Sequence, residues 1–302
     1  MENNQERKIV ELDAILKSDE FLNGKKDSLT FAIGQTREGE ILCGDFSQCR
    51  HVLIGGSTYS GNGELLCSMI SSLIQKYSPN ELKLILIDLK RVEFVIFNGL
   101  PHLLTGEILK DPIQTINAFN WAIREMERRY ELFAQRTRSG VATRTIDEYN
   151  LSCENEGEKL AKVVLVVEEI ADMMSLAKNE FEERVQRLTQ KSRAAGIYLV
   201  LATQRPTTTV ITGVIKSCMP TRIAFRTPLA LDSVVILDQE GAENLGGKGD
   251  GILKCDWSSE CIRFQCAYVS SLQCKEIVEA TKAKYPLSVD LEAVEYINRA
   301  EE

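Results

Sequence analysis

The clearest chemical signal in this sequence is a glycine- and hydroxyl-rich turn set between an apolar run and a helical run. Residues 51–67 read HVLIGGSTYSGNGELLC, which is typical of a buried strand, a turn and a helix. This is the layout of the phosphate-binding loop G-x-x-x-x-G-K-[ST], whose backbone N–H groups cradle phosphates. The candidate nucleotide-binding residues are therefore Gly56, Ser57, Thr58, Tyr59, Ser60, Gly61, Asn62 and Gly63.

The loop keeps both glycines of the motif but lacks its two reactive side chains. Asn62 stands where the motif has a lysine that reaches the β- and γ-phosphates, and Gly63 stands where it has a magnesium-binding hydroxyl. Asn62 can donate a hydrogen bond but carries no charge. Losing one preorganised donor of this kind costs on the order of 3 kcal/mol of transition-state stabilisation. The loop therefore predicts a phosphate cradle with impaired catalysis.

Two glutamates follow the apolar run AKVVLVV at residues 161–167. A nucleotide hydrolase needs one carboxylate to position magnesium and a second to polarise the attacking water. Glu168 takes the metal-side position and Glu169 the water-activating position. Glu168 is one methylene longer than the usual aspartate, which matters because magnesium demands short contacts in octahedral geometry. In isolation such a pair equally fits the start of a solvated loop.

The surrounding sequence alternates buried strands with amphipathic helices. This alternation predicts a mostly parallel sheet that helices cover on both faces. Residues 1–30 read as helical, residues 29–46 as short strands with turns, and residues 136–158 as polar and irregular. The expected strands are 51–55, 82–89, 161–167, 197–202 and 222–225, and the expected helices are 64–77, 112–136, 181–195 (ended by Gly196), 272–284 and 289–299.

The composition is that of a soluble globular protein. The 302 residues are 44% hydrophobic and 26% charged, and no segment reaches the roughly 18 unbroken apolar residues of a membrane helix. The charged N-terminus lacks the apolar core of a signal peptide, which predicts a cytoplasmic protein. Nine scattered cysteines and two histidines favour neither a disulfide framework nor zinc. The net charge of −8 argues against a generally basic surface but allows a local basic channel.

Several further segments make the chain resemble the motor domain of the FtsK/SpoIIIE DNA translocases. They run in the family's order from about residue 28 to about residue 280, and the block with RAAG, ATQRP and VITG is the most specific. The segments are HVLIGGSTYSG (51–61), LILIDLKRVEF (84–94), GLPHLLT (99–105), WAIREMERRYELF (121–133), VVEEIADMM (166–174), QKSRAAGIYLVLATQRPTTTVITGVIK (190–216), PTRIAF (220–225) and LDQEGAENLGGKGDGIL (237–253).

The resemblance implies an α/β fold with a RecA-like P-loop NTPase core, a mostly parallel sheet flanked by helices. The expected division is an N-terminal helix and small β extension (1–50), the motor core (51–280) and a C-terminal helical tail (281–302). ATP and Mg²⁺ are the implied cofactors and double-stranded DNA the implied partner. The resemblance also implies a hexameric ring or association with an active family member. The family's membrane-spanning region and winged helix have no counterpart in this sequence, so we expect a free-standing motor module.

Five residues can be carried over from the family by position. Arg193 falls where the family places an arginine that reaches a neighbour's nucleotide, and Gln204 falls where a polar sensor contacts the γ-phosphate. With Glu169 they form the expected catalytic set. Arg205 and Lys216 fall on the segment that faces DNA.

The departures from the family pattern cluster on function. Ala230 and Val234 replace residues that tend to be basic or polar, and Tyr59 replaces a loop glycine. A tyrosine there requires a backbone that avoids strongly positive φ or accepts strain. Together with Asn62 and Gly63 these changes favour a pseudo-ATPase that acts as a partner, regulator or scaffold. We expect any bound nucleotide to be indifferent to magnesium.

Two alternatives stay open. An active ATP-dependent double-stranded DNA translocase would need a replacement cation, for which Lys90 and the neighbour's Arg193 are the candidates. A secretion-type relative would bind protein in place of DNA, which agrees with the missing basic residues at positions 230 and 234. DNA-stimulated ATP turnover and salt-dependent DNA binding would distinguish these functions.

Overall fold

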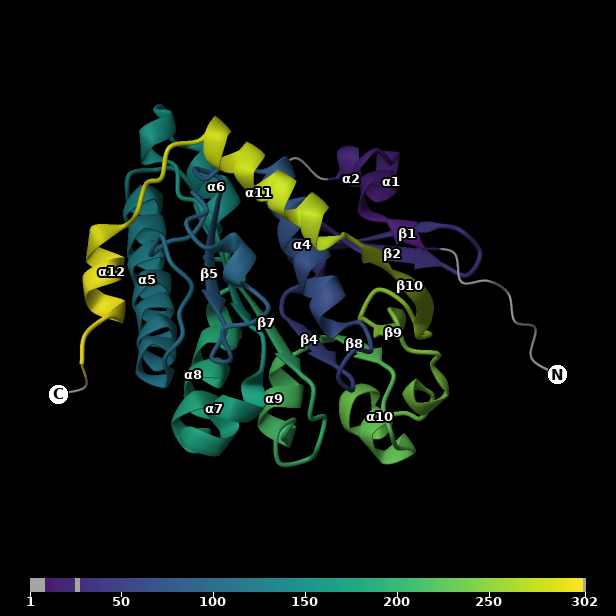
Figure 1. The fold of residues 1–302 in the computed structure, drawn as a ribbon. Helices are drawn as coiled ribbons and strands as arrows, with labels where there is room; N and C mark the ends of the chain where they lie inside the picture. Colours follow the sequence, from purple (N-terminus) through teal and green to yellow (C-terminus); the bar gives the residue numbers. More distant parts are fainter. Residues whose placement is uncertain (1–8, 25–27, 301–302) are drawn as a thin grey trace.

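Among the described residues, ten strands form one sheet. A computed structural model describes residues 9–24 and 28–300, and Figure 1 shows the arrangement. The strands are β1 (Val10–Glu11), β2 (Thr30–Thr36), β3 (Ile41–Asp45), β4 (Val52–Gly55), β5 (Leu82–Ile87), β6 (Lys162–Val167), β7 (Ile197–Thr203), β8 (Thr221–Phe225), β9 (Asp250–Lys254) and β10 (Ile262–Tyr268).

The sheet has a parallel half and an antiparallel half. Its order is β3-β2-β10-β9-β8-β4-β7-β6-β5, with β1 paired to β10. Strands β8, β4, β7, β6 and β5 are parallel to one another, whereas β9, β10, β2 and β3 continue the sheet in antiparallel pairs. The parallel core is as predicted. Strands β9 and β10 were not anticipated, because their short polar-interrupted segments carry no continuous apolar run.

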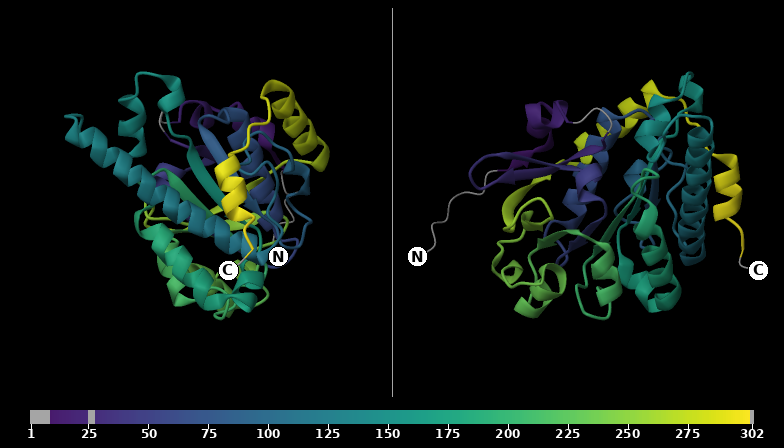
Figure 2. Two further views of the ribbon diagram at one scale, coloured as in Figure 1. Left: turned by 90° about the vertical axis from the view of Figure 1, so that its left-hand side faces the viewer. Right: turned by 180° about the vertical axis from the view of Figure 1, so that it is seen from behind.

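Helices cover both faces of the sheet, as the alternation predicts (Figures 1 and 2). Short 3₁₀ turns lie at Val95–Phe97, Glu156–Glu158 and Ala242–Asn244. The helices are α1 (Leu12–Leu16), α2 (Asp19–Leu22), α3 (Phe46–Cys49), α4 (Asn62–Lys76), α5 (Pro112–Arg138), α6 (Ile146–Leu151), α7 (Ile170–Leu176), α8 (Lys178–Lys191), α9 (Gly213–Cys218), α10 (Ala230–Leu237), α11 (Ser271–Lys284) and α12 (Leu291–Ile297).

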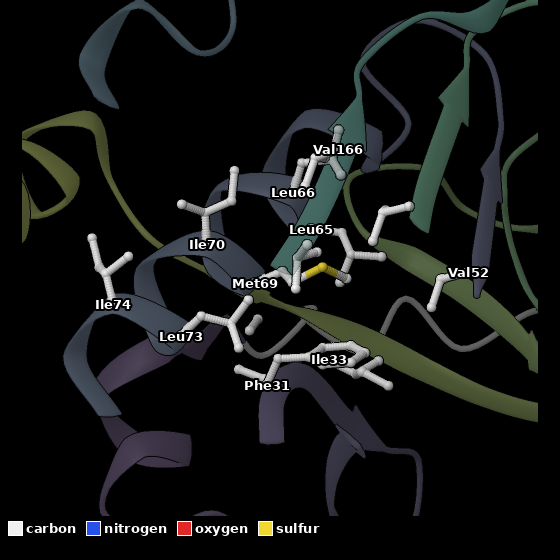
Figure 3. Close-up of a cluster of buried hydrophobic side chains, with 14 of the residues drawn as sticks. Phe31, Ile33, Val52, Leu65, Leu66, Met69, Ile70, Leu73, Ile74 and Val166 are labelled. Atoms are coloured by element: carbon white, nitrogen blue, oxygen red, sulfur yellow. The ribbon is translucent and has the colours of Figure 1, made fainter. Parts of the chain in front are cut away.

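Successive residues of the central strands enter opposite cores. Val52 and Ile54 of β4 pack in the core under α4 and α11, whereas Leu53 packs in the core under α5 and α8. This two-residue period is what a strand buried on both faces requires. Figure 3 shows the first core, in which Phe31 of β2 meets the apolar face of α4, including Met69.

Two expectations from the sequence need correction. The polar segment 136–158 contains α6, which begins with a capping box between Thr145 and Glu148. In the described part of the N-terminal segment, Val10 and Glu11 pair with β10 and form the short strand β1. Two short helices follow it. Residues 1–8 and 25–27 of the expected N-terminal helix and its break lie outside the described residues.

The longest helix, α5, is fixed to the sheet through one buried guanidinium. Arg129 is 3% exposed and donates to Glu125 Oε1 at 2.7 Å, to the Ala195 carbonyl at 2.7 Å and to the Ala161 carbonyl at 2.9 Å. These bonds connect α5 to the segments that enter β6 and β7. In the described ranges, no helix is both long and apolar enough to cross a membrane.

Replacing Arg129 with alanine should destabilise the fold by about 3–5 kcal/mol, because Glu125 and two carbonyls lose a buried donor. Denaturant unfolding followed by circular dichroism measures the change. Arg128→Ala is the matched control, since Arg128 binds the same Glu125 but its side chain is 52% exposed. We expect the control to lose about 1 kcal/mol or less. Equal losses in the two variants would contradict the proposed anchoring.

Candidate nucleotide-binding site

The predicted phosphate loop joins β4 to α4 at the carboxyl edge of the parallel strands. The N–H of Gly56 donates to the Thr203 carbonyl at 3.3 Å, and the N–H of Ser57 donates to the Arg226 carbonyl at 2.8 Å. The loop is therefore held between the ends of β7 and β8. Gly56 must be a glycine, because a Cβ there would lie 2.8 Å from the Cβ of Phe225.

The backbone of this loop forms an anion cradle. In the described structure, the N–H groups of residues 58, 59 and 61–64 have no acceptor within the chain. They lie at the N-terminus of α4, a helix of 15 residues whose dipole favours negative charge at this end. Gly61 has a φ of +144°, which allows the sharp turn into the helix. A phosphate group fits this arrangement.

The loop side chains are engaged with the protein itself. Asn62 Nδ2 donates to the Thr203 carbonyl at 2.9 Å and to the Gly56 carbonyl at 3.4 Å, and its Oδ1 has no partner. The amide that replaces the motif lysine is thus committed to β7. Tyr59 is 91% exposed and has a φ of +59°. Its backbone therefore takes the strained left-handed conformation, at a cost of roughly 1–2 kcal/mol.

Glu169 is the most heavily bonded side chain of the site. Its Oε1 accepts from Thr203 Oγ1 at 2.6 Å and from the Ala171 N–H at 3.1 Å. Its Oε2 accepts from the Gln204 N–H at 3.1 Å and from Lys90 Nζ at 3.2 Å. A carboxylate offers about four acceptor positions, and here four donors occupy them. Glu169 caps α7 and connects it to β7.

Glu168 is linked to the loop through Gln204. The Gln204 Nε2 donates to Glu168 Oε1 at 3.1 Å, and Gln204 Oε1 accepts from Thr58 Oγ1 at 2.9 Å. Glu168 is 4% exposed, and its Oε2 has no hydrogen-bond partner among the described residues. The structure therefore brings the predicted residues Glu168, Glu169 and Gln204 together beside the loop.

Burial sets the electrostatics of this carboxylate group. It raises the pKa of Glu168 to about 7, with Lys90 acting in the opposite direction and Glu169 reinforcing the rise. Burial, together with the charges of Glu64 and Asp88, also raises the pKa of Glu93. Although burial opposes it, the neighbouring Glu169 and Glu168 raise the pKa of Lys90. Lys90 is thus held as a cation among glutamates.

The side chains of Arg193, Arg205 and Lys216 make no hydrogen bond to the loop in the described structure. Arg193 precedes β7 at the opposite edge of the sheet, where its Nη2 donates to the Ser47 carbonyl of α3 at 2.8 Å. Arg205 follows β7 and is exposed. Lys216 Nζ lies 2.8 Å from Asp238 Oδ1, and Asp238 also binds Arg222 and Lys254.

Three residues of the site were not singled out from the sequence. Asp88 ends the run that forms β5 and accepts the N–H groups of Arg91, Val92 and Phe94, which fixes the loop after β5. A polar residue at the carboxyl end of a parallel strand is a signal that could have identified it. Thr203 supports Glu169, and Glu93 faces Gly63. No local sequence pattern predicts the contact between Glu93 and Gly63.

Known proteins resemble this chain in sequence over most of its length. The profile of the FtsK/SpoIIIE family matches residues 11–208. The DNA translocase FtsK of Clostridium tetani is 42% identical over 291 residues, which are 96% of this chain and 38% of that protein. The chain thus spans less than two fifths of this curated relative.

Two solved structures share the fold. The conjugation coupling protein TcpA of pCW3, in its monomer form with ATPgS, matches with a TM-score of 0.73 and 25% identity over 91% of this chain and 75% of that chain. The cytoplasmic domain of the type VII secretion ATPase EccC from Thermomonospora curvata matches with a TM-score of 0.76 and 24% identity over 91% of this chain and 34% of that chain. The predicted P-loop NTPase fold is confirmed.

Glu168 should make stability depend on pH. Its pKa is raised from the ordinary 4.5 to about 7, so between these values the folded chain holds a proton that the unfolded chain has released. Its contribution to stability therefore falls as pH rises through this window. Glu168→Gln cannot titrate, and its stability relative to wild type should increase from about pH 5 to about pH 8.

Denaturant unfolding of both proteins at the two pH values measures this effect. Burial lowers the pKa values of His51 and His102 to about 4, but both histidines are present in both proteins and cancel in the comparison. Glu107→Gln, at an exposed position outside the site, is the matched control and should show no such trend. A stability difference for Glu168→Gln that does not change with pH would contradict the prediction.

Proposed function

The chain belongs to the FtsK/SpoIIIE family, and we propose that it is a translocase-type motor module that binds ATP but hydrolyses it poorly. The unbonded N–H groups at the start of α4 support nucleotide binding, because they form an anion site that needs no lysine. We propose that the module acts as a partner, regulator or scaffold beside an active family member.

The four hydrogen bonds to Glu169 are the observation that carries the proposal of poor hydrolysis. A general base must accept a proton from the attacking water, so one carboxylate oxygen must be open to that water. Thr203, Lys90 and two backbone N–H groups occupy both oxygens. Asn62 adds to the defect, because it brings no charge to the phosphates and is bonded to β7.

We propose duplex DNA as the partner and a ring of copies as the assembly. Arg193 supports a ring, since it is exposed at the sheet edge opposite its own loop and could act only on a neighbour's nucleotide. Arg205 supports a DNA contact, since it is exposed beyond the end of β7. A hexamer is the assembly that the family resemblance implies.

Binding of a protein in place of DNA is a second candidate function. Residues 227–234, a second segment that the family resemblance would place against DNA, expose Leu229 by 61% and Leu231 by 65%. Apolar side chains of this kind contribute to protein contacts and gain nothing from phosphates. The likeness to the EccC structure supports the shared fold and does not decide the partner.

An ATPase assay with and without duplex DNA tests the first proposal. Wild type should bind a fluorescent ATP analogue yet release no phosphate in response to DNA. Glu169→Gln should likewise release no phosphate in response to DNA, because the carboxylate of Glu169 already has both oxygens occupied by donors. DNA-stimulated phosphate release that Glu169→Gln abolishes would instead establish an active translocase.

Filter binding of duplex DNA over a range of salt tests the choice of partner. The affinity should fall linearly with the logarithm of salt concentration, and Arg205→Ala should reduce the slope by about 0.9, the value of one phosphate contact. Arg144→Ala is the matched control, because Arg144 is exposed on a loop with no proposed role. Absence of salt-dependent DNA binding would refute the DNA partner and favour a protein.

A further inference from the structure

A carboxylate occupies the space of the side chain that α4 lacks. A Cβ built on Gly63 would lie 2.8 Å from Glu93 Oε2 and 3.3 Å from Glu93 Cδ. A serine or threonine at position 63 would therefore require Glu93 to move. In the phosphate-loop motif, this position supplies the hydroxyl oxygen that binds magnesium. An oxygen of Glu93 is thus within reach of the place where that hydroxyl would stand.

The position of Glu93 is fixed by the chain around it. Asp88 accepts the N–H groups of Arg91, Val92 and Phe94 at 2.8, 2.9 and 3.0 Å. These bonds surround Glu93 in sequence and hold its loop against the end of β5. Phe94, the next residue, is fully buried. The carboxylate therefore faces α4 from a rigid segment.

The second carboxylate of the site, that of Glu168, has one oxygen that accepts no hydrogen bond from the described residues. Glu168 is 4% exposed, and its Oε2 has no hydrogen-bond partner among the described residues. A buried carboxylate oxygen without a donor is costly unless a proton or a cation completes it. The Glu168 N–H donates to the Ile87 carbonyl at 3.1 Å, which places Glu168 beside Asp88 and the loop that carries Glu93. The site therefore offers carboxylate oxygens in place of the hydroxyl oxygen that Gly63 lacks.

We infer that Glu93 and Glu168 hold a divalent cation bridged to the phosphates of a bound nucleotide, with Glu93 replacing the hydroxyl that Gly63 lacks. This inference rests on the proposed nucleotide binding. Magnesium fits the donor set, because it is commonly held by one or two carboxylates together with phosphate oxygens and water. Within the described residues, no group of three or more histidine, cysteine or acidic side chains could hold a metal alone. In the proposed site, phosphate oxygens and water complete the coordination.

The inference reverses the expectation drawn from the sequence. Loss of the hydroxyl and of the metal-side aspartate predicts a nucleotide that is indifferent to magnesium. Two carboxylates that face the loop instead predict that phosphate binds poorly alone and well as a metal complex, because the cation screens their repulsion. If Glu93 merely blocked the loop, its removal would strengthen nucleotide binding with or without metal.

Nucleotide affinity of the full chain with and without metal tests the assignment. The dissociation constant of a fluorescent, non-hydrolysable ATP analogue is measured in EDTA and in excess Mg²⁺. Wild type should bind about tenfold or more tightly with Mg²⁺. Glu93→Gln keeps the shape of the side chain and removes its charge, and it should lose most of the Mg²⁺ effect without weakening the affinity in EDTA. Glu107→Gln, at an exposed position outside the site, should behave like wild type.

Two further measurements read the cation and its ligand directly. Electron paramagnetic resonance of Mn²⁺ should show protein-bound metal with wild type only when the ATP analogue is present, and Glu93→Gln should reduce this bound fraction. Adding Gly63→Ser to Glu93→Ala should restore part of the Mg²⁺ effect, because a hydroxyl then has the space that Glu93 fills.

The possible failures are distinguishable. A Mg²⁺ effect that Glu93→Gln leaves unchanged would overturn the ligand assignment while leaving nucleotide binding intact. Tighter binding of Glu93→Gln in both EDTA and Mg²⁺ would also overturn it and identify Glu93 as a block. Absence of nucleotide binding under every condition would overturn the proposed function and the inference together.

Discussion

The buried carboxylate of Glu169 holds together the edge of the sheet on which the whole site is built. It joins Thr203 and Gln204 at the end of β7, Ala171 in α7 and Lys90 beyond β5. A charge buried to this degree must have its acceptor positions filled, or the fold loses several kcal/mol. Under the proposed function, the same four donors that stabilise the edge also withhold the carboxylate from an attacking water. The bonds that stabilise this edge would therefore prevent the two oxygens of Glu169 from accepting a proton from water.

In the phosphate loop, the backbone can bind a phosphate group, whereas positive charge and metal ligation require side chains. Its N–H groups point outward at the N-terminus of α4 because the strand, the turn and the helix fix them, whatever the side chains are. Positive charge and metal ligation come only from side chains, and there Asn62 and Gly63 supply neither. The charged side chains of the site instead include Lys90, Glu93 and Glu168. A metal–phosphate complex suits this distribution better than free phosphate.

The surfaces proposed to contact a neighbouring copy and DNA also differ from the family pattern in charge and in exposed apolar area. Lys216 and Arg205 remain, but Lys216 forms part of an ion cluster in which Arg222 and Lys254 share Asp238. Three cations around one carboxylate still leave positive charge at this place. Leu229 and Leu231 add exposed apolar area nearby in sequence. Arg193 is on the opposite edge of the sheet from its own loop, so only a second copy could bring it to a nucleotide site.

The sequence alone determined the parallel core, both of its covered faces and the position of the loop, because these follow from local periodicity and from the glycines that the turn requires. It also identified Glu168 and Glu169 from their place after a predicted strand, and Gln204 through the family resemblance. It missed the helices α6, α7, α9 and α10 and the strands β9 and β10, whose short segments carry no long periodic pattern. Only the tertiary structure decided that Asn62 bonds to β7, that Glu169 is saturated and that Glu93 fills the place of a side chain at Gly63. Apart from the bond between Glu169 and the nearby Ala171 N–H, these contacts join residues 30 to 141 positions apart, and no periodicity or local motif encodes them.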